Sequence, residues 1–270
     1  MVRVGAAIVV FVLAALFKLL SSGGDVPMSS SPATRTVDEL PAPPSLGPDS
    51  PQPTAEVRDA PTAGATSAAL PISHGDFDYY VLVLSRSPTH CSSDAGQGRG
   101  NDMQCRSGRP FGFVLHGLWP QNEHGYPQNC DSSEPREVSD TNMTRALKVA
   151  PSETLVRHEW EKHGMCAGLS QDDFFSSAIT AFSSLALPAS YKLPAQPIET
   201  TPDEVRDAFL AINPQLAQED VSATCSRNEL AEVWVCLDKS LHPRACSNEV
   251  RKRHCGGRHV RMLATRGDWP

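Results

Sequence analysis

All eight cysteines of this 270-residue chain lie beyond residue 90, and no other feature limits its fold as strongly. An even number of cysteines in an exported protein is typical of a disulfide framework. The common spacing of a zinc site, Cys-x-x-Cys, occurs nowhere in the chain. We therefore expect four disulfides, formed in an oxidising compartment. The cysteines are Cys91, Cys105, Cys130, Cys166, Cys225, Cys236, Cys246 and Cys255.

An apolar run at the N-terminus predicts export. Arg3 precedes the run Val4–Leu20, which only Lys18 interrupts. A positive charge followed by about 15 apolar residues is typical of a secretory signal peptide. An uncleaved signal anchor is the alternative, because Lys18 could extend its ammonium group to the membrane interface. Residues 1–23 are thus predicted to be a signal peptide or a signal anchor. We expect a secreted or periplasmic protein, tethered to the membrane if the segment is retained.

A Pro-, Ala- and Ser-rich stretch follows and predicts a disordered linker over 24–73. Its few apolar residues are too scattered to bury a core. Residues 74–270 remain as one folded domain of about 200 residues. That length is enough to bury a core without a metal or a partner chain, so we expect a monomer.

The charge of the chain limits its function. The formal net charge is −7 at pH 7. Proteins that hold nucleic acid by neutralising many phosphates usually have a basic surface. The charge therefore argues against a stable nucleic-acid complex, but not against an enzyme that contacts one phosphate and one or two bases.

Three segments predict strands. Residues 77–84, FDYYVLVL, are β-branched and aromatic and predict a strand that is buried on both faces. Residues 111–116 predict a second strand, which Gly117 and Trp119-Pro120 should end. Residues 229–237 predict a third.

Helices are expected between these strands. Residues 144–149 predict a short helix, and Ser152 should cap the N-terminus of a longer one. Apolar residues at helical spacing predict a helix over 172–187, ended by Pro188. Thr201-Pro202 should begin another. Because strands and helices are interspersed without regular βαβ units, we expect an α+β domain.

A cluster of titratable residues lies within the second predicted helix, in the segment HEWEKHG from His158 to Gly164. If the helix continues through it, residues four apart share a face, so Glu159 lies beside His163 and His158 beside Lys162. Glu159 should then raise the pKa of His163, and Lys162 should oppose that rise. Such opposed tuning is typical of acid–base sites. Weak surface ion pairs are the simpler alternative.

A zinc-protease motif is excluded at this cluster. In H-E-x-x-H the two histidines share one helix face, whereas His158 and His163 are five residues apart and point about 140° away from each other. Lys162 stands where the second ligand would be, and its positive charge would repel a cation. We therefore expect neither a metal nor another cofactor.

A further histidine, His116, ends the second predicted strand and precedes glycine and an aromatic residue. An imidazole there is well placed beside a pocket, although a lone histidine at a strand end is more often structural. Together, Phe113–Gln121 (FVLHGLWPQ) and His158–Cys166 (HEWEKHGMC) resemble the two active-site segments of the ribonuclease T2 family. The resemblance extends from about Phe77 to Cys255. It implies a disulfide-stapled α+β domain with a central, mainly antiparallel sheet and flanking helices. The implied function is an exported endoribonuclease that cleaves single-stranded RNA.

The resemblance also implies a role for each catalytic residue. His116 would be the general acid that protonates the leaving 5′-oxygen, and His163 would be the general base, held by Glu159. Lys162 and Glu159 would stabilise the pentacovalent phosphorane, and His158 would hold the phosphate. The 2′-oxygen would attack its own phosphorus, giving a 2′,3′-cyclic phosphate and then a 3′-phosphate. A relative that binds RNA or a protein without cleaving is the alternative, but all five catalytic residue types are present.

Two substrate-binding residues are implied in the same way. Trp119 matches a position where an aromatic ring stacks on a base, with a core tryptophan as the alternative. Gln121 stands where some relatives carry an acidic residue that selects purines, so we expect low base specificity. Trp160 is expected to pack in the core. Arg86 departs from the family, in which tryptophan commonly follows the first strand, and this leaves the packing around it open.

The family's pattern implies a pairing that the cysteines alone leave open. Cys130–Cys166 would tie the two active-site segments together, and Cys91–Cys105 would close the Gly-rich loop 92–108. In the C-terminal part, Cys236–Cys246 would be nested inside Cys225–Cys255.

Overall fold

The computed structural model describes residues 75–98 and 100–269. The predicted signal segment, 1–23, and the predicted linker, 24–73, lie outside the described residues. No helix of the described ranges is both long and apolar enough to span a membrane.

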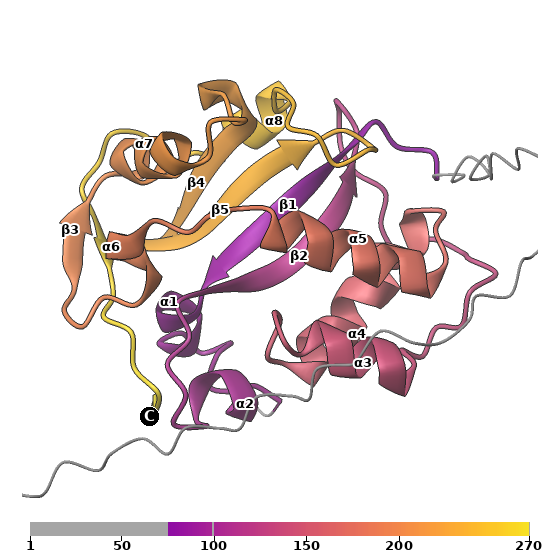
Figure 1. Cartoon of the computed structure of the whole chain (residues 1–270), viewed down its shortest axis with the longest axis horizontal. Helices are drawn as coiled ribbons and strands as arrows, with labels where there is room; N and C mark the ends of the chain where they lie inside the picture. Colours follow the sequence, from indigo (N-terminus) through magenta and orange to yellow (C-terminus); the bar gives the residue numbers. More distant parts are fainter. Residues whose placement is uncertain (1–74, 99, 270) are drawn as a thin grey trace, which may run out of the picture. The chain divides into compact units, whose positions relative to one another are not determined.

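A six-stranded, mainly antiparallel sheet runs through the domain (Figure 1). Its four longer strands lie in the order β2, β1, β5, β4, and each neighbouring pair is antiparallel. At one end of β5, the short strand β6 is a parallel neighbour, and it pairs in turn with β3. The predicted α+β class with a mainly antiparallel sheet is confirmed. The strands are β1 (Tyr79–Arg86), β2 (Phe113–Gln121), β3 (Ile198–Thr200), β4 (Val221–Ser226), β5 (Glu229–Leu237) and β6 (Val260–Met262).

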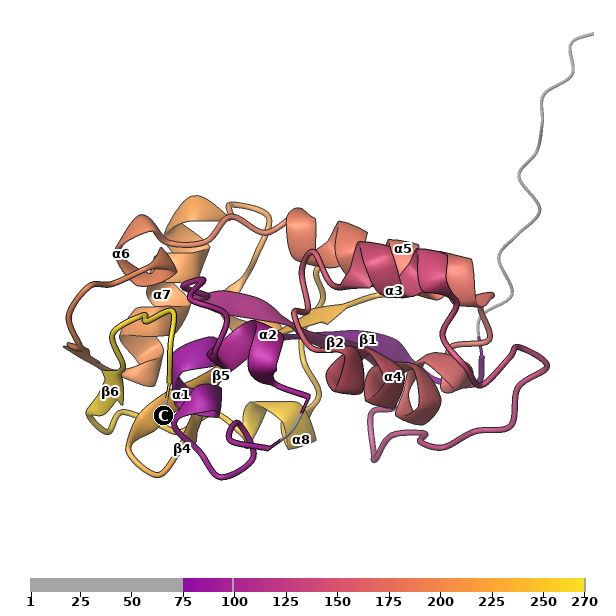
Figure 2. The same ribbon diagram turned by 90° about the horizontal axis from the view of Figure 1, so that it is seen from below.

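Helices lie on both faces of the sheet, with α3, α5 and α7 on one face and α8 on the other (Figure 2). The larger core packs under α3, α4, α5 and α7, where Trp160, Phe174 and Phe209 are buried. The smaller core packs under α8, whose Val250 is 3% exposed. The helices are α1 (Ser87–Cys91), α2 (Asp102–Cys105), α3 (Asp140–Ala146), α4 (Glu153–Lys162), α5 (Gln171–Ser183), α6 (Ala189–Lys192), α7 (Pro202–Ile212) and α8 (Asn248–Arg251).

The first predicted strand is β1, which begins two residues later than expected. Its residues from Tyr79 to Leu84 are all fully buried. Tyr80 and Leu82 face the larger core, while Val81 and Val83 face the smaller one. The prediction of a strand buried on both faces is confirmed.

β2 continues to Gln121, so the prediction that Gly117 and Trp119-Pro120 would end this strand is wrong. β2 is an edge strand of the sheet. Proline is tolerated on an edge because its missing N–H group need not serve a neighbouring strand. The active-site segment therefore lies along the open edge of the sheet.

The two predicted N-caps are confirmed. The Ser152 hydroxyl accepts a hydrogen bond from the backbone N–H of Leu155 at the start of α4. The Thr201 hydroxyl accepts one from Glu204, whose side chain binds back to complete a capping box at α7. These interactions are local, which is why the sequence reveals them.

Other helix boundaries differ from the prediction. α3 begins at Asp140, earlier than the predicted residue 144, and α5 ends at Ser183 instead of at Leu187. The side-chain amide of Asn213 binds both backbone groups of Ala186, at 2.8 Å to N–H and 3.0 Å to the carbonyl. This distant contact holds the segment before Pro188 out of the helix.

All four predicted disulfides form. Cys91–Cys105 joins the ends of α1 and α2, the latter a short helix inside the predicted loop 92–108. Cys130–Cys166 joins the loop after β2 to the turn after α4, and so connects the two active-site segments. The nested pairs Cys236–Cys246 and Cys225–Cys255 fasten the segment around α8 to β5 and β4.

The buried Arg86 side chain fills the position where the family commonly has tryptophan. Its guanidinium lies 5.3 Å from the ring centroid of Phe113 and donates to the Leu263 carbonyl and the Thr265 hydroxyl. Burial lowers the pKa of Arg86 to about 10. Arg86 therefore ties the end of β1 to the C-terminal segment.

Trp160 is fully buried against Phe174 and Phe175, and its Nε1 donates to the Pro135 carbonyl at 2.9 Å, which confirms its place in the core. Trp160→Phe should lower the free energy of unfolding by about 1–3 kcal/mol, because it removes the indole hydrogen bond and leaves a small cavity in the core. Urea unfolding measures the change. Trp269→Phe, at a half-buried ring, is the matched control and should change stability little. Equal effects of the two substitutions would contradict this role for Trp160.

Candidate active site

A β-bulge places His116 in the site. The neighbouring β1 residues Val83 and Leu84 pair with Gly117 and Leu115, which leaves His116 as the extra residue of β2. Bulges change the direction of a side chain and are frequent beside active sites. The His116 imidazole therefore leaves the regular alternation of the strand and points toward β5 and α4.

Two carboxylates hold the His116 ring. Its Nδ1 lies 2.6 Å from Glu232 Oε1 on β5, and its Nε2 lies 3.4 Å from Glu159 Oε1 on α4. The second oxygen of each carboxylate accepts an indole hydrogen bond. Trp119 Nε1 donates to Glu159 at 2.6 Å, and Trp234 Nε1 donates to Glu232 at 2.7 Å. Each carboxylate is thus fixed at both of its oxygens.

This arrangement keeps His116 protonated. Both ring nitrogens face carboxylate oxygens, so the favoured state is the imidazolium, which donates from both. Burial alone would lower the pKa of His116, but the hydrogen bonds and charges of Glu159 and Glu232 outweigh it and raise this pKa to about 10. Burial would raise the pKa of the Glu232 carboxyl, but the hydrogen bond to His116 and its charge outweigh burial and lower that pKa. His116 is therefore a cation at neutral pH.

His163 lies just beyond the end of α4, and its backbone N–H still donates to the Glu159 carbonyl at 3.1 Å, so the two residues are neighbours as the helical spacing predicted. The helix ends at Lys162, and the backbone of His163 departs from helical geometry with φ −121° and ψ −47°. The Glu159 carboxylate contacts His116 and Trp119. The Glu159 side chain thus makes two contacts across the fold that helical spacing did not predict.

The surroundings of His163 keep it neutral. The ring is 3% exposed, and burial, together with repulsion from Lys162, His158 and His116, lowers its pKa to about 4. Glu159 acts in the predicted, raising direction, but burial outweighs it, so the expected net rise is wrong. Among the described residues, His163 Nδ1 has no hydrogen-bond partner. His163 is therefore a neutral imidazole with a nitrogen free to accept a proton.

The Trp119 indole connects the two histidines. It stacks on His163, with ring centroids 5.1 Å apart and planes 23° apart, and meets His116 edge-on at 5.2 Å. Its Nε1 also holds Glu159. Trp119 is partly exposed and lines a pocket, so it is not simply a core residue.

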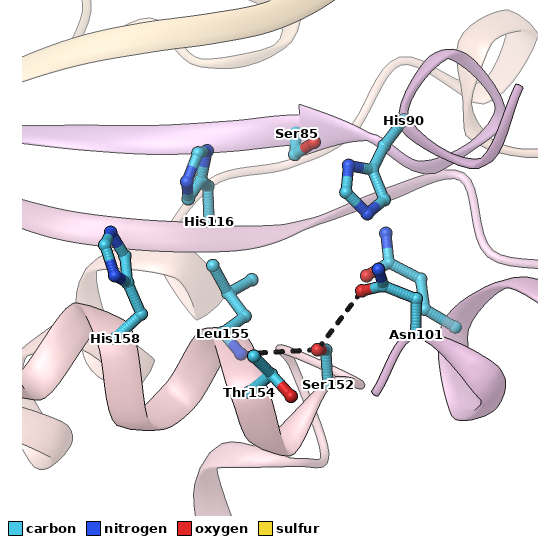
Figure 3. A pocket seen from close by; sticks show the side chains of 9 residues that line it. Ser85, His90, Asn101, His116, Ser152, Thr154, Leu155 and His158 are labelled. Atoms are coloured by element: carbon cyan, nitrogen blue, oxygen red, sulfur yellow. Dashed lines mark hydrogen bonds between the residues drawn. The ribbon is translucent and has the colours of Figure 1, made fainter. Parts of the chain in front are cut away.

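A pocket of about 230 Å³ opens on the His116 side. In Figure 3 the imidazoles of His116, His158 and His90 face this pocket from β2, α4 and α1. Asn101 closes its far end and accepts a hydrogen bond from the Ser152 hydroxyl at 3.4 Å.

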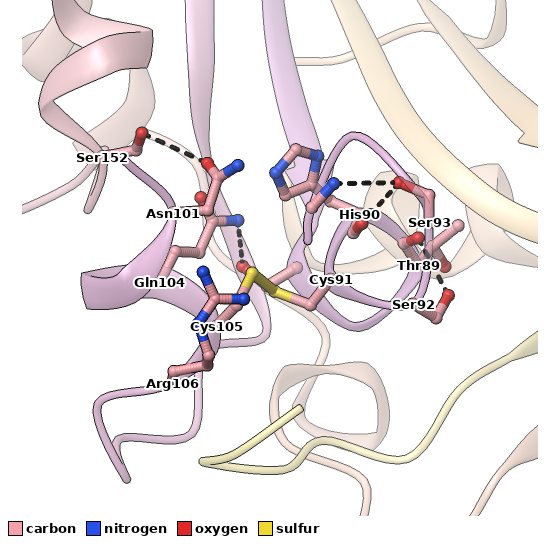
Figure 4. The surroundings of a disulfide bond; sticks show 12 residues. Thr89, His90, Cys91, Ser92, Ser93, Asn101, Gln104, Cys105, Arg106 and Ser152 are labelled. Atoms are coloured by element: carbon pink, nitrogen blue, oxygen red, sulfur yellow. Dashed lines mark hydrogen bonds between the residues drawn. A yellow bond between two sulfur atoms is a disulfide. The ribbon is translucent and has the colours of Figure 1, made fainter. Parts of the chain in front are cut away.

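The disulfide Cys91–Cys105 supports that wall (Figure 4). It joins the helix that carries His90 to the helix that carries Gln104, whose side chain donates to the Ser87 hydroxyl at 2.8 Å. The pocket wall is thus built from a covalently closed loop and does not depend on a continuous core.

A second pocket, of about 250 Å³, opens on the His163 side. Its wall combines aromatic rings with polar and charged side chains. Gln121 lies on this wall and donates to the Gly125 carbonyl at 2.7 Å. The lining residues are Trp119, Gln121, Gly125, Tyr126, Lys162, His163, Trp234, Glu249, Val250 and Arg253.

Four of the five predicted catalytic residues line these two pockets. His116 and His158 line the first, Lys162 and His163 line the second, and Glu159 lies between them against His116 and Trp119. Trp119 and Gln121, predicted to bind substrate, both line the second pocket. Within the described part of the chain, no group of three His, Cys, Asp or Glu side chains is placed to hold a metal ion.

The family resemblance placed the segment Glu232–Cys236 beside the site, but sequence reasoning gave no role to Glu232 or Trp234 and missed His90 and Tyr126. For Glu232 a signal existed, because it lies two residues from Trp234 in a predicted strand and residues two apart share a face. A carboxylate beside an indole on a largely buried strand indicates a specific polar contact. His90 and Tyr126 lie in loops or short helices and carry no such pattern.

Comparison with known proteins identifies the relatives of this chain. The model of the ribonuclease T2 family matches residues 77–246, more than half of the chain. The chain belongs to the ribonuclease T2 family. A ribonuclease from Aeromonas hydrophila is 35% identical over 202 residues, which cover 67% of this chain and 83% of that protein. A probable ribonuclease from Haemophilus influenzae is 34% identical over 184 residues, which cover 64% of this chain and 62% of that protein. The protein is a T2-type endoribonuclease, and RNA is its substrate.

Solved structures share the fold. An RNase-related protein from Calystegia sepium has a TM-score of 0.55 and 23% identity, covering 72% of this chain and 100% of that one. Trichomaglin, an S-like ribonuclease, has a TM-score of 0.54 and 19% identity, covering 70% and 98%. The central sheet with flanking helices is therefore a known arrangement.

Gly117 is required where the Glu159 carboxylate meets the edge strand. A Cβ at residue 117 would lie 1.9 Å from Glu159 Oε2 and 2.5 Å from Trp119 Nε1, which are the two atoms that hydrogen-bond to each other. Gly117→Ala should therefore separate them and lower kcat/KM for RNA about 10- to 100-fold, because the group that orients His116 is displaced.

Initial rates on RNA, with the unfolding midpoint measured alongside, test this expectation. Gly98→Ala is the matched control, since its Cβ would come no closer than 3.4 Å to the Ala95 carbonyl. Wild-type kcat/KM in the Gly117→Ala protein would show that the site tolerates a side chain there.

Proposed function

We propose that this endoribonuclease cleaves single-stranded RNA by transphosphorylation, with His163 as general base and His116 as general acid. One observation carries the proposal. On the two sides of Trp119, His116 has a pKa raised to about 10 and His163 a pKa lowered to about 4. An acid–base pair needs one protonated and one neutral member at the working pH. Both conditions are met over a wide pH range.

The chemistry follows from these protonation states. His163 takes the proton of the ribose 2′-hydroxyl, and the 2′-oxygen forms a bond to the adjacent phosphorus. The bond from phosphorus to the 5′-oxygen breaks, and His116 gives its proton to that oxygen. The first products are a 2′,3′-cyclic phosphate and a free 5′-hydroxyl. Water then opens the ring to a 3′-phosphate, with the roles of the histidines exchanged. Because the nucleophile belongs to the substrate, DNA should not react.

Charged residues around the pair would hold the phosphate. Lys162 and His158 approach from the second and the first pocket respectively, and we assign both to the scissile phosphate and its phosphorane. Glu159 is assigned to orienting the His116 imidazolium, because its oxygens contact His116 and Trp119. This assignment replaces the expected contact between Glu159 and His163.

The two pockets would take the two nucleosides. The second pocket is lined by the base His163, so we assign to it the nucleoside whose 2′-hydroxyl reacts. The first pocket is lined by the acid His116 and would take the leaving nucleoside. Trp119 and Tyr126 offer aromatic faces on which every base can stack. We therefore propose low base specificity. Initial rates on poly(U), poly(A) and poly(C) that differ by more than about 100-fold would exclude it.

A product assay tests the proposed reaction. Purified protein incubated with RNA in EDTA should release fragments with 2′,3′-cyclic phosphate ends, and it should leave DNA of the same sequence intact. Binding without cleavage would support instead a relative that has lost catalysis. Cleavage that stops in EDTA would exclude the metal-free mechanism.

Removal of the general base gives the sharpest test of the roles. His163→Ala should lower kcat about 10²- to 10⁴-fold, the usual contribution of a general base, and the unfolding midpoint measured alongside shows whether the fold is kept. Quench-flow or steady-state rates on a dinucleotide measure kcat. Full activity in this variant would refute the assignment of His163.

The pH profile separates the two histidines. Plotted against pH, kcat/KM should rise through about 4, as His163 loses its proton, and fall through about 10, as His116 loses its own. Glu232→Gln removes a charge that raises the pKa of His116, so the alkaline limb should move to lower pH. The acid limb is the internal control and should stay in place. An alkaline limb that does not move would show that another group titrates there.

We further propose that the protein is an exported monomer, secreted or periplasmic. Four disulfides in the described domain support an oxidising compartment. Residues 1–23 would direct export, residues 24–73 would link them to the domain, and a retained N-terminus would serve as a tether. The N-terminal residue of the mature protein tests cleavage, and sedimentation equilibrium tests the monomer. A mature protein that begins at Met1 would favour the tether.

A further inference from the structure

The C-terminal segment has a charge opposite to that of the whole chain. Between Arg244 and Arg266 there are seven Lys or Arg residues and one acidic residue, Glu249, although the formal net charge of the chain is −7. Three of the cations are consecutive, at Arg251, Lys252 and Arg253, and all three are exposed. A run of charges is usually a solvated surface, so its position relative to the active site decides whether it has a function.

Two disulfides hold this basic turn in place. Cys246 precedes it and is joined to β5, and Cys255 follows it and is joined to β4. Val250 is 3% exposed in the smaller core, and its carbonyl accepts the backbone N–H of Arg253 at 2.9 Å. The His254 ring accepts the Ala223 backbone N–H at 3.0 Å. The turn is therefore presented in one conformation, which lowers the entropy lost on binding a ligand.

Arg253 is the member of this run that lines the second pocket, together with His163 and Lys162. Among the described residues its guanidinium makes no hydrogen bond and no ion pair. The carboxylate of Glu249 lines the same pocket, but it accepts the Gly125 backbone N–H at 2.9 Å and lies 3.6 Å from His124 Nδ1. The pocket thus offers a guanidinium without a protein partner, beside a carboxylate that is already engaged.

The direction of the RNA strand follows from which histidine lines which pocket. The nucleoside whose 2′-hydroxyl His163 deprotonates lies on the 5′ side of the scissile phosphate. The second pocket, which holds His163 and Arg253, is therefore the upstream side, while His116 and the first pocket are the downstream side. The scissile phosphate is attached to the 3′-oxygen of the upstream ribose. A phosphate on the 5′-oxygen of the same ribose therefore projects from its other end, away from the scissile phosphate. Guanidinium groups bind such phosphates with paired N–H donors.

We propose that Arg253 binds the phosphate one nucleotide upstream of the scissile phosphodiester, so that RNA carrying this phosphate is the preferred substrate. This inference rests on the proposed roles of His163 and His116. Arg251 and Lys252 are the other exposed cations of this turn, and neither lines the second pocket. A basic binding element thus lies within an acidic protein, confined to one end of the site.

Three small substrates test the inference: the dinucleotide UpU, its 5′-phosphorylated form pUpU, and its 3′-phosphorylated form UpUp. In the wild-type protein, kcat/KM for pUpU should exceed that for UpU about 3- to 5-fold, the upper end for one exposed charge-assisted contact. Arg253→Gln should abolish that ratio. It should leave the ratio of UpUp to UpU unchanged. The slope of log kcat/KM against log salt for pUpU should become shallower by about 0.7.

Arg227→Gln is the matched control, because Arg227 is also an exposed arginine and lines a different pocket. It should keep the ratio of pUpU to UpU. A wild-type ratio near one, or a ratio that survives in Arg253→Gln, would overturn the inference and leave the basic turn as a solvated surface. Absence of UpU cleavage by the wild-type protein would instead overturn the proposed function on which the inference rests. Equal unfolding midpoints of the variants confirm that the fold is unchanged.

Discussion

The contact between His116 and its two carboxylates is the interaction on which the rest of the site depends. Glu159 and Glu232 come from α4 and β5, which are distant in sequence, and meet at one ring on β2. Two indole N–H groups fix the remaining carboxylate oxygens. Removing one member of such a partly buried cluster leaves charge without a partner, which costs far more than an exposed ion pair. The positions of β2, β5 and α4 are therefore coupled through the charge of one imidazole.

Burial gives the second histidine the opposite property. Among the described residues no carboxylate forms an ion pair with the His163 ring, and its 3% exposure lets desolvation decide its protonation state. The two imidazoles on either side of one indole thus differ because His116 is in contact with two carboxylates, whereas burial outweighs the effect of Glu159 on His163. Trp119 takes part in both environments, through its hydrogen bond to Glu159 and its stacking on His163. A single aromatic residue therefore holds the pair at a fixed separation.

Pockets and disulfides shape the surroundings of this arrangement. His116 on β2 meets Glu232 on β5 across the intervening strand β1, so the site lies on one face of the sheet. The walls around it are loops and short helices, fastened by Cys91–Cys105, Cys130–Cys166 and the nested pair around α8. These covalent links constrain the walls in addition to the apolar packing of residues such as Val250. The basic turn that carries Arg253 is one of these fastened segments.

By itself, the sequence determined the features that depend on neighbouring residues and on recognisable motifs. These include the caps at Ser152 and Thr201, the strand β5, the α+β class, and the residues of the two active-site segments. Only the tertiary structure decided that β2 continues through Gly117, since that depends on an edge position and on the approach of Glu159. It also decided that Glu159 serves His116, that Glu232 completes the site, and that burial lowers the pKa of His163. The physical reason is that hydrogen-bond partners and desolvation are set by residues distant along the chain, which local spacing does not reveal.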